Sequence, residues 1–257
     1  MMGLGALSWA LSWALLLVSA LLVGFAKSGI SGTGILAVPL MAMAFPAKQS
    51  VGVLLPMLIV ADILAVITYH RHARWALLWP LFPWVIVGIV IATAVAEHLS
   101  DNHLQPLIGI IVIAMLLISW RKGRNRDVAP SARNPLAVAG LGVLCGITTM
   151  LANAAGPIMT AYLLVMRLPK VEFIGTGAWY FLLLNVFKIP FMIYLGTISL
   201  PSLKLNAIMV PVVLLGGAIG IWTVKRIDES RFRFVVTLLA WAAAITLLAS
   251  ALPQLPL

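Results

Sequence analysis

Long apolar runs separated by short polar turns fill nearly the whole chain. A transmembrane helix needs about 20 mostly apolar residues, and eight of the runs reach or approach that length. They lie near residues 7–26, 50–69, 76–96, 104–120, 135–151, 173–194, 206–223 and 232–251, and two shorter runs lie at 34–45 and 156–166. This pattern predicts an all-α integral membrane protein.

Each of the two shorter runs follows a break rich in glycine or small polar residues, at 27–34 and at 148–157. The distribution of Lys and Arg decides whether these runs cross the membrane, because cytoplasmic loops collect both residues. If both runs turn back, the basic residues outside the spans divide eight to eight; if both cross, fourteen are cytoplasmic and only Lys48 and Lys204 lie outside. We therefore predict ten segments, with both termini outside the cytoplasm.

The two halves of the chain share glycine and proline positions. At offsets of 122 and 128, residues of the first half recur in the second: Gly24, Gly34, Pro83, Gly88 and Ala92 as Gly146, Gly156, Pro211, Gly216 and Gly220. Five segments per half is an odd number, so the second half would enter the membrane upside down. Such inverted repeats with interrupted helices are typical of secondary transporters. Coincidence is the alternative explanation, because glycine and proline are common in membrane helices.

We accordingly predict a single transmembrane transporter domain over residues 1–257. Its first repeat covers about 1–120, a basic cytoplasmic loop covers 121–134, and its second repeat covers about 135–257. Each repeat has about five segments and one interrupted helix.

The composition agrees with a membrane protein. Hydrophobic residues make up 63% of the chain and charged residues only 9%, whereas a soluble domain has about 25% charged residues. The formal net charge of +10 then serves to orient the chain and to contact anionic lipid, and we expect no nucleic-acid partner. Cys145 has no second cysteine, and the four histidines lack metal-ligand spacing, so we expect no metal and no cofactor.

The breaks and three ionisable residues in apolar runs form the candidate site. Unwound backbone at membrane depth needs protein or a cavity around it, and helix N-termini bind oxyanions. By symmetry the two breaks should face each other near the midplane. The candidate substrate-binding residues are Lys27, Ser28, Gly29, Ser31, Gly32, Thr33, Gly34, Asn153, Gly156, Asn185 and Lys188. Asp62, which matches Asn185 at an offset of 123, is the candidate for coupling transport to a proton.

These residues also have structural interpretations. Either lysine could extend its ammonium group to the membrane surface. Asp62 could be a buried partner that holds one lysine in the fold rather than handling substrate. The hydroxyls of the first break could simply satisfy backbone groups there.

The first break lies in a stretch, 24–40, that resembles the first signature of the sulfite/sulfonate exporter family (TauE/SafE type). The stretches at 146–157, 168–176 and 185–190 are similar to the second half of the same family, so the resemblance covers nearly the whole chain. It implies a carrier for small sulfur-containing anions such as sulfite, sulfoacetate or related sulfonates. Many members have a richer glycine run after the first break, which Ser31 and Thr33 interrupt here; this departure bears on the shape of the site and on the substrate.

We therefore expect a secondary transporter, an exporter of such anions, in the inner membrane of a bacterium, and no enzymatic activity. Two helix N-termini, two lysines and several hydroxyls suit an acceptor-only oxyanion. The alternatives are a carrier of another small anion or of a cation or metal ion, a membrane enzyme, and a membrane assembly protein that does not transport. The expected partners are a small anionic substrate, membrane lipid and a coupling proton, and a homo-oligomer is left open.

Overall fold

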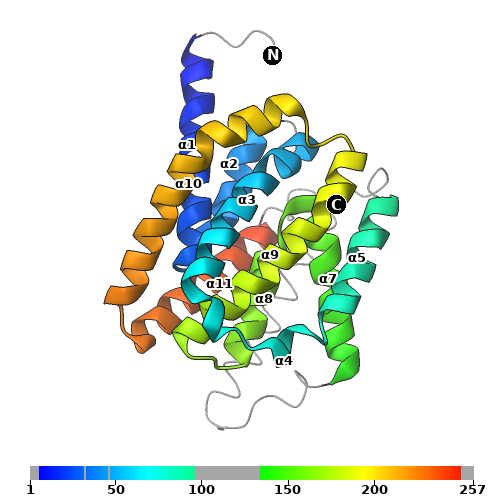
Figure 1. Cartoon of the computed structure of the whole chain (residues 1–257), viewed down its shortest axis with the longest axis vertical. Coiled ribbons are helices and arrows are strands. Elements are labelled where there is room, and N and C mark those ends of the chain that lie inside the picture. The colour runs from blue at the N-terminus through cyan, green and yellow to red at the C-terminus, as the bar shows by residue number, and fades with distance from the viewer. Residues whose placement is uncertain (1–5, 32, 46, 96–133, 250–257) are drawn as a thin grey trace.

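The computed structural model describes residues 6–31, 33–45, 47–95 and 134–249, and every element within them is helical. The first half forms α1 (Ala6–Ser28), the 3₁₀ turn η1 (Thr33–Leu36), α2 (Ala37–Ala44), α3 (Ala47–Tyr69), the 3₁₀ turn η2 (His70–His72), α4 (Trp75–Leu78) and α5 (Phe82–Val95). The second half forms α7 (Pro135–Ala152), α8 (Ala155–Val165), α9 (Lys170–Tyr194), α10 (Leu200–Arg226) and α11 (Glu229–Ala249) (Figure 1). The predicted all-α architecture is confirmed.

Five of the described helices are long and apolar enough to cross a membrane, namely α1, α3, α7, α9 and α10. The predicted single span at 76–96 is wrong, because a turn at 79–81 separates α4 from α5. Pro80 lies in this turn and has no N–H to donate to the preceding helical turn. The predicted span at 104–120 and nearly all of the basic loop at 121–134 lie outside the described residues.

The two short helices reverse the chain without being full-length spans. At 1.5 Å per residue, the 8 residues of α2 and the 11 of α8 extend only about 12 and 17 Å, against a hydrocarbon core of about 30 Å. The Ser28 carbonyl at the end of α1 accepts a hydrogen bond from the Tyr69 hydroxyl at the end of α3. Because α1 and α3 end on the same side, α2 must return toward the side from which α1 came, as the ten-segment topology requires.

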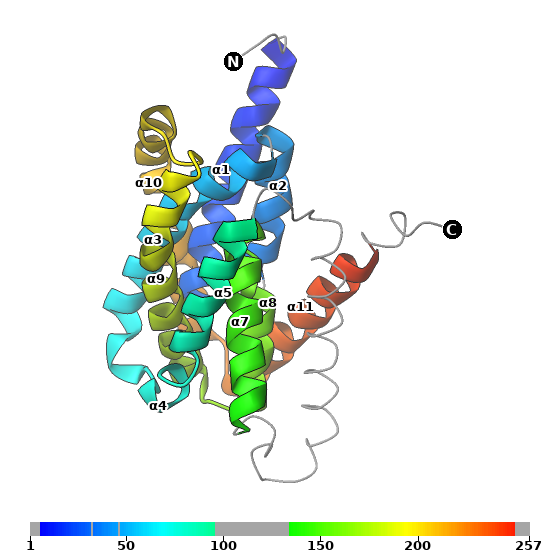
Figure 2. The same cartoon turned by 90° about the vertical axis from the view of Figure 1, so that its right-hand side faces the viewer.

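Close glycine contacts join each half to the other. A Cβ added to Gly24 of α1 would lie 1.9 Å from the Val213 carbonyl oxygen of α10, and one added to Gly146 of α7 would lie 2.2 Å from that of Val85 in α5. Gly146 is the counterpart of Gly24 at the offset of 122, and Val213 is the counterpart of Val85 at the offset of 128. Recurring residues thus make equivalent contacts, and α1 and α7 run in opposite directions (Figure 2). The inverted repeat stays a prediction with which this packing agrees.

Helices α3 and α9 pack antiparallel between these two pairs. Gly52 near the start of α3 lies against Thr197, just beyond the end of α9. Gly175 near the start of α9 lies against Tyr69, the last residue of α3, and His72 of η2. Gly52 and Gly175 are again counterparts, at an offset of 123. This antiparallel register brings the middle of α3, with Asp62, opposite Asn185 of α9.

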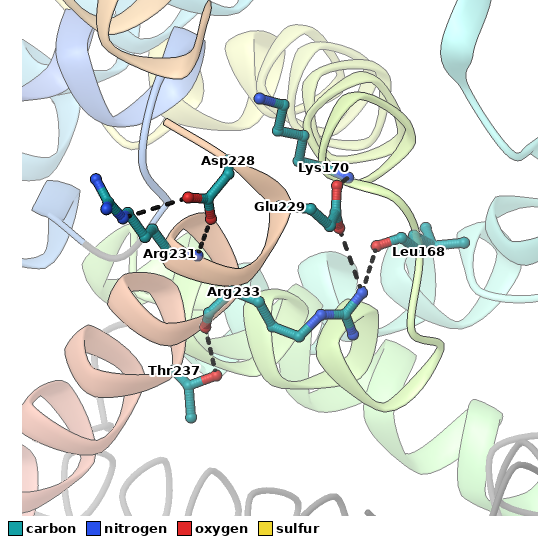
Figure 3. A network of polar contacts seen from close by, with 7 residues as sticks. All are labelled: Leu168, Lys170, Asp228, Glu229, Arg231, Arg233 and Thr237. Atoms are coloured by element: carbon teal, nitrogen blue, oxygen red, sulfur yellow. Dashed lines mark hydrogen bonds and ion pairs between the residues drawn. The ribbon is translucent and has the colours of Figure 1, made fainter. Parts of the chain in front are cut away.

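Basic residues gather at the end of the bundle where α8, α9, α10 and α11 meet. The Lys170 ammonium donates to the carbonyls of Val224 and Ile227, at 3.0 and 2.5 Å, and its backbone N–H donates to the Glu229 carboxylate at 2.9 Å. Figure 3 shows this turn together with Arg231 and Arg233, which face Asp228 and Glu229. The ten-segment prediction assigns this end to the cytoplasm.

Candidate functional site

The Lys27 side chain, from the last turn of α1, points into the bundle. Its Nζ atom lies 2.9 Å from Oδ1 of Asp62 on α3 and 3.7 Å from the ring centroid of Phe181 on α9. The Lys27 side chain is 14% exposed and that of Asp62 is fully buried. The interpretation in which the Lys27 ammonium extends to the membrane surface is wrong, because a buried carboxylate holds its charge.

Asp62 also accepts a hydrogen bond from Asn185. The two side chains meet at 2.6 Å between Nδ2 of Asn185 and Oδ2 of Asp62. Each carboxylate oxygen of Asp62 therefore has its own partner, a lysine for one and an amide for the other. The pair joins the counterpart positions of the two halves, at the contact of α3 with α9.

Lys188 is held by three neutral acceptors. Its Nζ atom donates to the Thr149 carbonyl at 2.7 Å, to the Thr149 hydroxyl at 3.2 Å and to Oδ1 of Asn153 at 2.6 Å. All three partners are oxygen acceptors, which suits the N–H donors of a lysine side chain. The side chain is fully buried, and the expectation that it could extend to the surface is wrong. The acceptors belong to the C-terminal end of α7, which carries partial negative charge.

Asn153 shapes this acceptor set through its backbone. Its φ of 51° is left-handed, and its N–H bonds back to the last turn of α7. Asparagine tolerates this conformation better than most residues, which makes it a suitable helix end. Its Nδ2 donates to the Val51 carbonyl of α3 at 3.0 Å, so the amide is fixed at both ends and presents its oxygen to Lys188.

The breaks are narrower than the sequence predicts. Residues 148–152 are helical and belong to α7, which leaves only residues 153 and 154 between α7 and α8. The Thr148 hydroxyl bonds to the Leu144 carbonyl of its own helix. Likewise Lys27 and Ser28 are the last residues of α1. Helix formation satisfies backbone groups that would otherwise be exposed at membrane depth.

Among the described residues, no hydroxyl of the first break forms a hydrogen bond with Lys27 or Lys188. The Thr33 hydroxyl donates to the Ile30 carbonyl at 3.1 Å, so it satisfies a backbone group of the break. The Ser28 hydroxyl is buried with no hydrogen-bond partner in the described part of the chain. Gly29 packs against Gly220, where its added Cβ would lie 2.7 Å from the Gly220 Cα, so its role there is close packing.

Five of the predicted residues come together as one polar cluster: Lys27, Asp62, Asn153, Asn185 and Lys188. One ion pair and the hydrogen bonds join these residues in two groups, Lys27–Asp62–Asn185 and Lys188–Asn153–Thr149. Asn185 and Lys188 lie three residues apart on α9 and so on one face of it. We call these five residues, with Thr149, the lysine cluster. The other predicted residues stay apart from its hydrogen bonds: Ser28, Gly29, Ser31, Thr33, Gly34 and Gly156. Gly32 lies outside the described residues. The breaks therefore do not face each other through their polar groups; Ile30 and Ala155 share an apolar core instead.

Sequence reasoning missed two members of the site. Phe181, Asn185 and Lys188 follow one another at intervals of four and three residues on α9, so helical periodicity places them on one face, and this signal was available. Thr149 lies inside the predicted break at 148–157 and was not singled out there; its carbonyl is a shorter contact to Lys188 than its hydroxyl. No pattern in the sequence indicates which backbone carbonyl a lysine will bind.

The cluster carries more positive than negative charge. Two lysines face one aspartate, which leaves a formal charge of +1 in a buried setting. Within the described ranges, no group of three or more His, Cys, Asp or Glu side chains could hold a metal ion. The arrangement is suited to receiving a negative charge near Lys27, whose ammonium has one carboxylate oxygen and one aromatic ring as neighbours.

Comparison with known proteins identifies the family of the chain. No curated protein and no solved structure matches the chain. A family model described as "Sulfite exporter TauE/SafE" matches residues 16–247, a range that includes the whole lysine cluster. The chain therefore belongs to the sulfite exporter TauE/SafE family of membrane transport proteins.

Proposed function

We propose that this protein is a secondary carrier that exports a small sulfur oxyanion, such as sulfite or an organosulfonate, across the inner membrane of a bacterium. The observation that carries the proposal is the excess of positive charge in the lysine cluster. The family description points to the same chemistry. A carrier role rather than an enzymatic one is part of this proposal.

The charge balance favours an anion over the alternatives. A charge buried in a membrane protein is costly unless a partner offsets it, and such residues usually mark a substrate or ion path. Lys188 is surrounded by neutral oxygens rather than by a carboxylate, so an entering anion would supply the missing negative charge. A cation would add to the excess, and a membrane assembly protein has no need of a buried lysine in this state.

The two lysines have different roles in this proposal. Lys188 has all three donors occupied, so it fixes the end of α7 and contributes charge from a distance. Lys27 has fewer polar contacts and is the more exposed of the two. We assign direct contact with the oxyanion to Lys27 and to the amide of Asn185, which can donate to an oxygen acceptor once Asp62 moves aside.

Transport by this site needs a change of conformation. Asp62 and Lys188 are fully buried, so an anion reaches them only after helices separate. Movement of one half against the other, as in other inverted-repeat carriers, would open the lysine cluster to each side in turn. Proton coupling through Asp62 remains part of the proposal, and an Asp62→Asn variant whose transport kept its full pH dependence would contradict that part.

The test is the flux of labelled sulfite in proteoliposomes. Wild type is compared with Lys27→Gln and Lys188→Gln, and with Lys204→Gln as a matched control, because Lys204 is an exposed lysine near the start of α10. Saturable flux in the wild type and the control that is lost in both cluster variants supports the proposal. Flux that survives in both cluster variants would place the site elsewhere, and no flux of sulfite or sulfonates in the wild type would contradict this substrate class.

A further inference from the structure

The Phe181 ring of α9 lies directly against the Lys27 ammonium group. Its centroid is 3.7 Å from Nζ of Lys27, the same atom that lies 2.9 Å from Oδ1 of Asp62. A cation at such a distance is attracted to the face of an aromatic ring, where the ring quadrupole is negative. The ring therefore occupies a position on Lys27 that favours negative charge.

Of the two neighbours of Lys27, the ring is the one that is more easily exchanged. The Asp62 carboxylate carries a full charge and is fully buried, so separating it from Lys27 costs more than separating a ring quadrupole. The Phe181 side chain is only partly buried, and that of Lys27 is 14% exposed. An anion can thus take the place of the ring while the ion pair with Asp62 is kept.

The position of Phe181 along α9 places its ring on the cytoplasmic side of Asn185. Phe181 comes four residues before Asn185, so it lies about one helical turn nearer to Lys170, where α9 begins. The ten-segment prediction assigns that end of α9 to the cytoplasm, and a helical side chain also leans toward the N-terminus of its helix. An exported anion would therefore meet the Phe181 ring before it meets Asn185.

We infer that the Phe181 ring competes with the carried anion for the Lys27 ammonium and is displaced when the anion binds. The inference rests on the proposed function and adds a residue to its site. An oxyanion gains charge-assisted hydrogen bonds from the ammonium, which outweigh the contact with the ring, whereas a neutral molecule gains no such bonds. Exchange of the ring thus makes Phe181 a specificity-determining residue that favours anions over neutral solutes.

Fluorinated phenylalanines at position 181 test this competition. Fluorine withdraws electron density from the face of the ring with little change of shape, so it weakens the contact with a cation. Purified protein with ordinary, mono-, di- or trifluorinated phenylalanine is titrated calorimetrically with sulfite. The dissociation constant should fall with each added fluorine, by about three- to tenfold over the series, because the competitor becomes weaker. The same series at Phe187 of α9, whose ring contacts Phe191, is the matched control and should leave the constant unchanged.

The same substitutions in Lys27→Gln separate competition from a direct effect of the ring on the anion. In that background the ring has no ammonium to compete for, so the constant should not change with fluorination. A constant that stays level or rises along the series with Lys27 present overturns the inference and leaves the proposed function standing. A constant that falls equally in Lys27→Gln also overturns it. A wild type that binds neither sulfite nor a sulfonate overturns the proposed function, and this inference with it.

Discussion

The glycine contact between α5 and α7 offers the sharpest test of the packing. In Gly146→Ala the new Cβ would lie 2.2 Å from the Val85 carbonyl oxygen, whereas an ordinary contact begins at about 3.4 Å. The neighbouring atoms are backbone atoms, so no side chain can rotate away and the helices must separate by about 1.2 Å. Overpacking of this kind typically costs about 1–3 kcal/mol.

The same helix supplies the control. A Cβ added to Gly140 of α7 would meet no atom within 4 Å, and alanine is favoured over glycine inside a helix by about 0.5–1 kcal/mol. The apparent midpoint of thermal unfolding, followed by tryptophan fluorescence in detergent, should therefore fall by roughly 5 °C in Gly146→Ala. It should stay level or rise slightly in Gly140→Ala.

The other pair of helices, α1 and α10, has the equivalent glycine contact. Gly24→Ala would bring its Cβ to 1.9 Å from the Val213 carbonyl oxygen of α10, so its midpoint should fall at least as far. Equal midpoints for Gly146→Ala and Gly140→Ala would refute the close packing of α5 on α7. A loss in Gly146→Ala without a loss in Gly24→Ala would refute the equivalence of the two helix pairs.

Three further predictions concern single contacts. Lys27→Met leaves the buried Asp62 carboxylate without its cation, so the free energy of unfolding should fall by about 3–5 kcal/mol. The double variant with Asp62→Asn should recover most of this loss. A double variant no more stable than Lys27→Met would refute the ion pair. Glu229→Gln removes the negative charge next to the first N–H of α9 and should lower the free energy of unfolding by up to about 1 kcal/mol. This loss should shrink in high salt, and a loss that does not change with salt would count against an electrostatic cause. Tyr69→Phe removes the hydrogen bond to the Ser28 carbonyl and should cost about 1 kcal/mol in thermal unfolding; an unchanged midpoint would mean that water replaces the hydroxyl.

Much of the helix layout could be predicted from the sequence, because apolar runs of the right length leave few other structures possible in a membrane. The run at 135–151 became α7 with an added residue, and 173–194 became the larger part of α9. The prediction of a single span at 76–96 was wrong because hydropathy does not take account of the effect of Pro80 on backbone hydrogen bonding. The second break was predicted to be too long, because Thr148 and Thr149 are small polar residues but belong to the last turns of α7.

The lysine cluster could be predicted in its members but not in its pairing. The offset of 123 placed Asp62 and Asn185 at matching positions, and they are hydrogen-bonded to each other. Whether Asp62 binds Lys27 or Lys188 depends on the register of α1 and α9 against α3, which no local pattern reports. Asn153 was chosen for a polar side chain, and its left-handed backbone, which directs the amide oxygen toward Lys188, belongs to the tertiary structure.

The central claim is that the excess positive charge of the lysine cluster binds the carried anion. Calorimetric titration of purified protein with sulfite tests it most directly, with Lys27→Gln beside the matched control Lys204→Gln. We predict saturable binding to the wild type and the control, and binding by Lys27→Gln that is weaker by about tenfold or more. Equal affinity in all three proteins would contradict the claim, because the anion would then bind without the buried lysine.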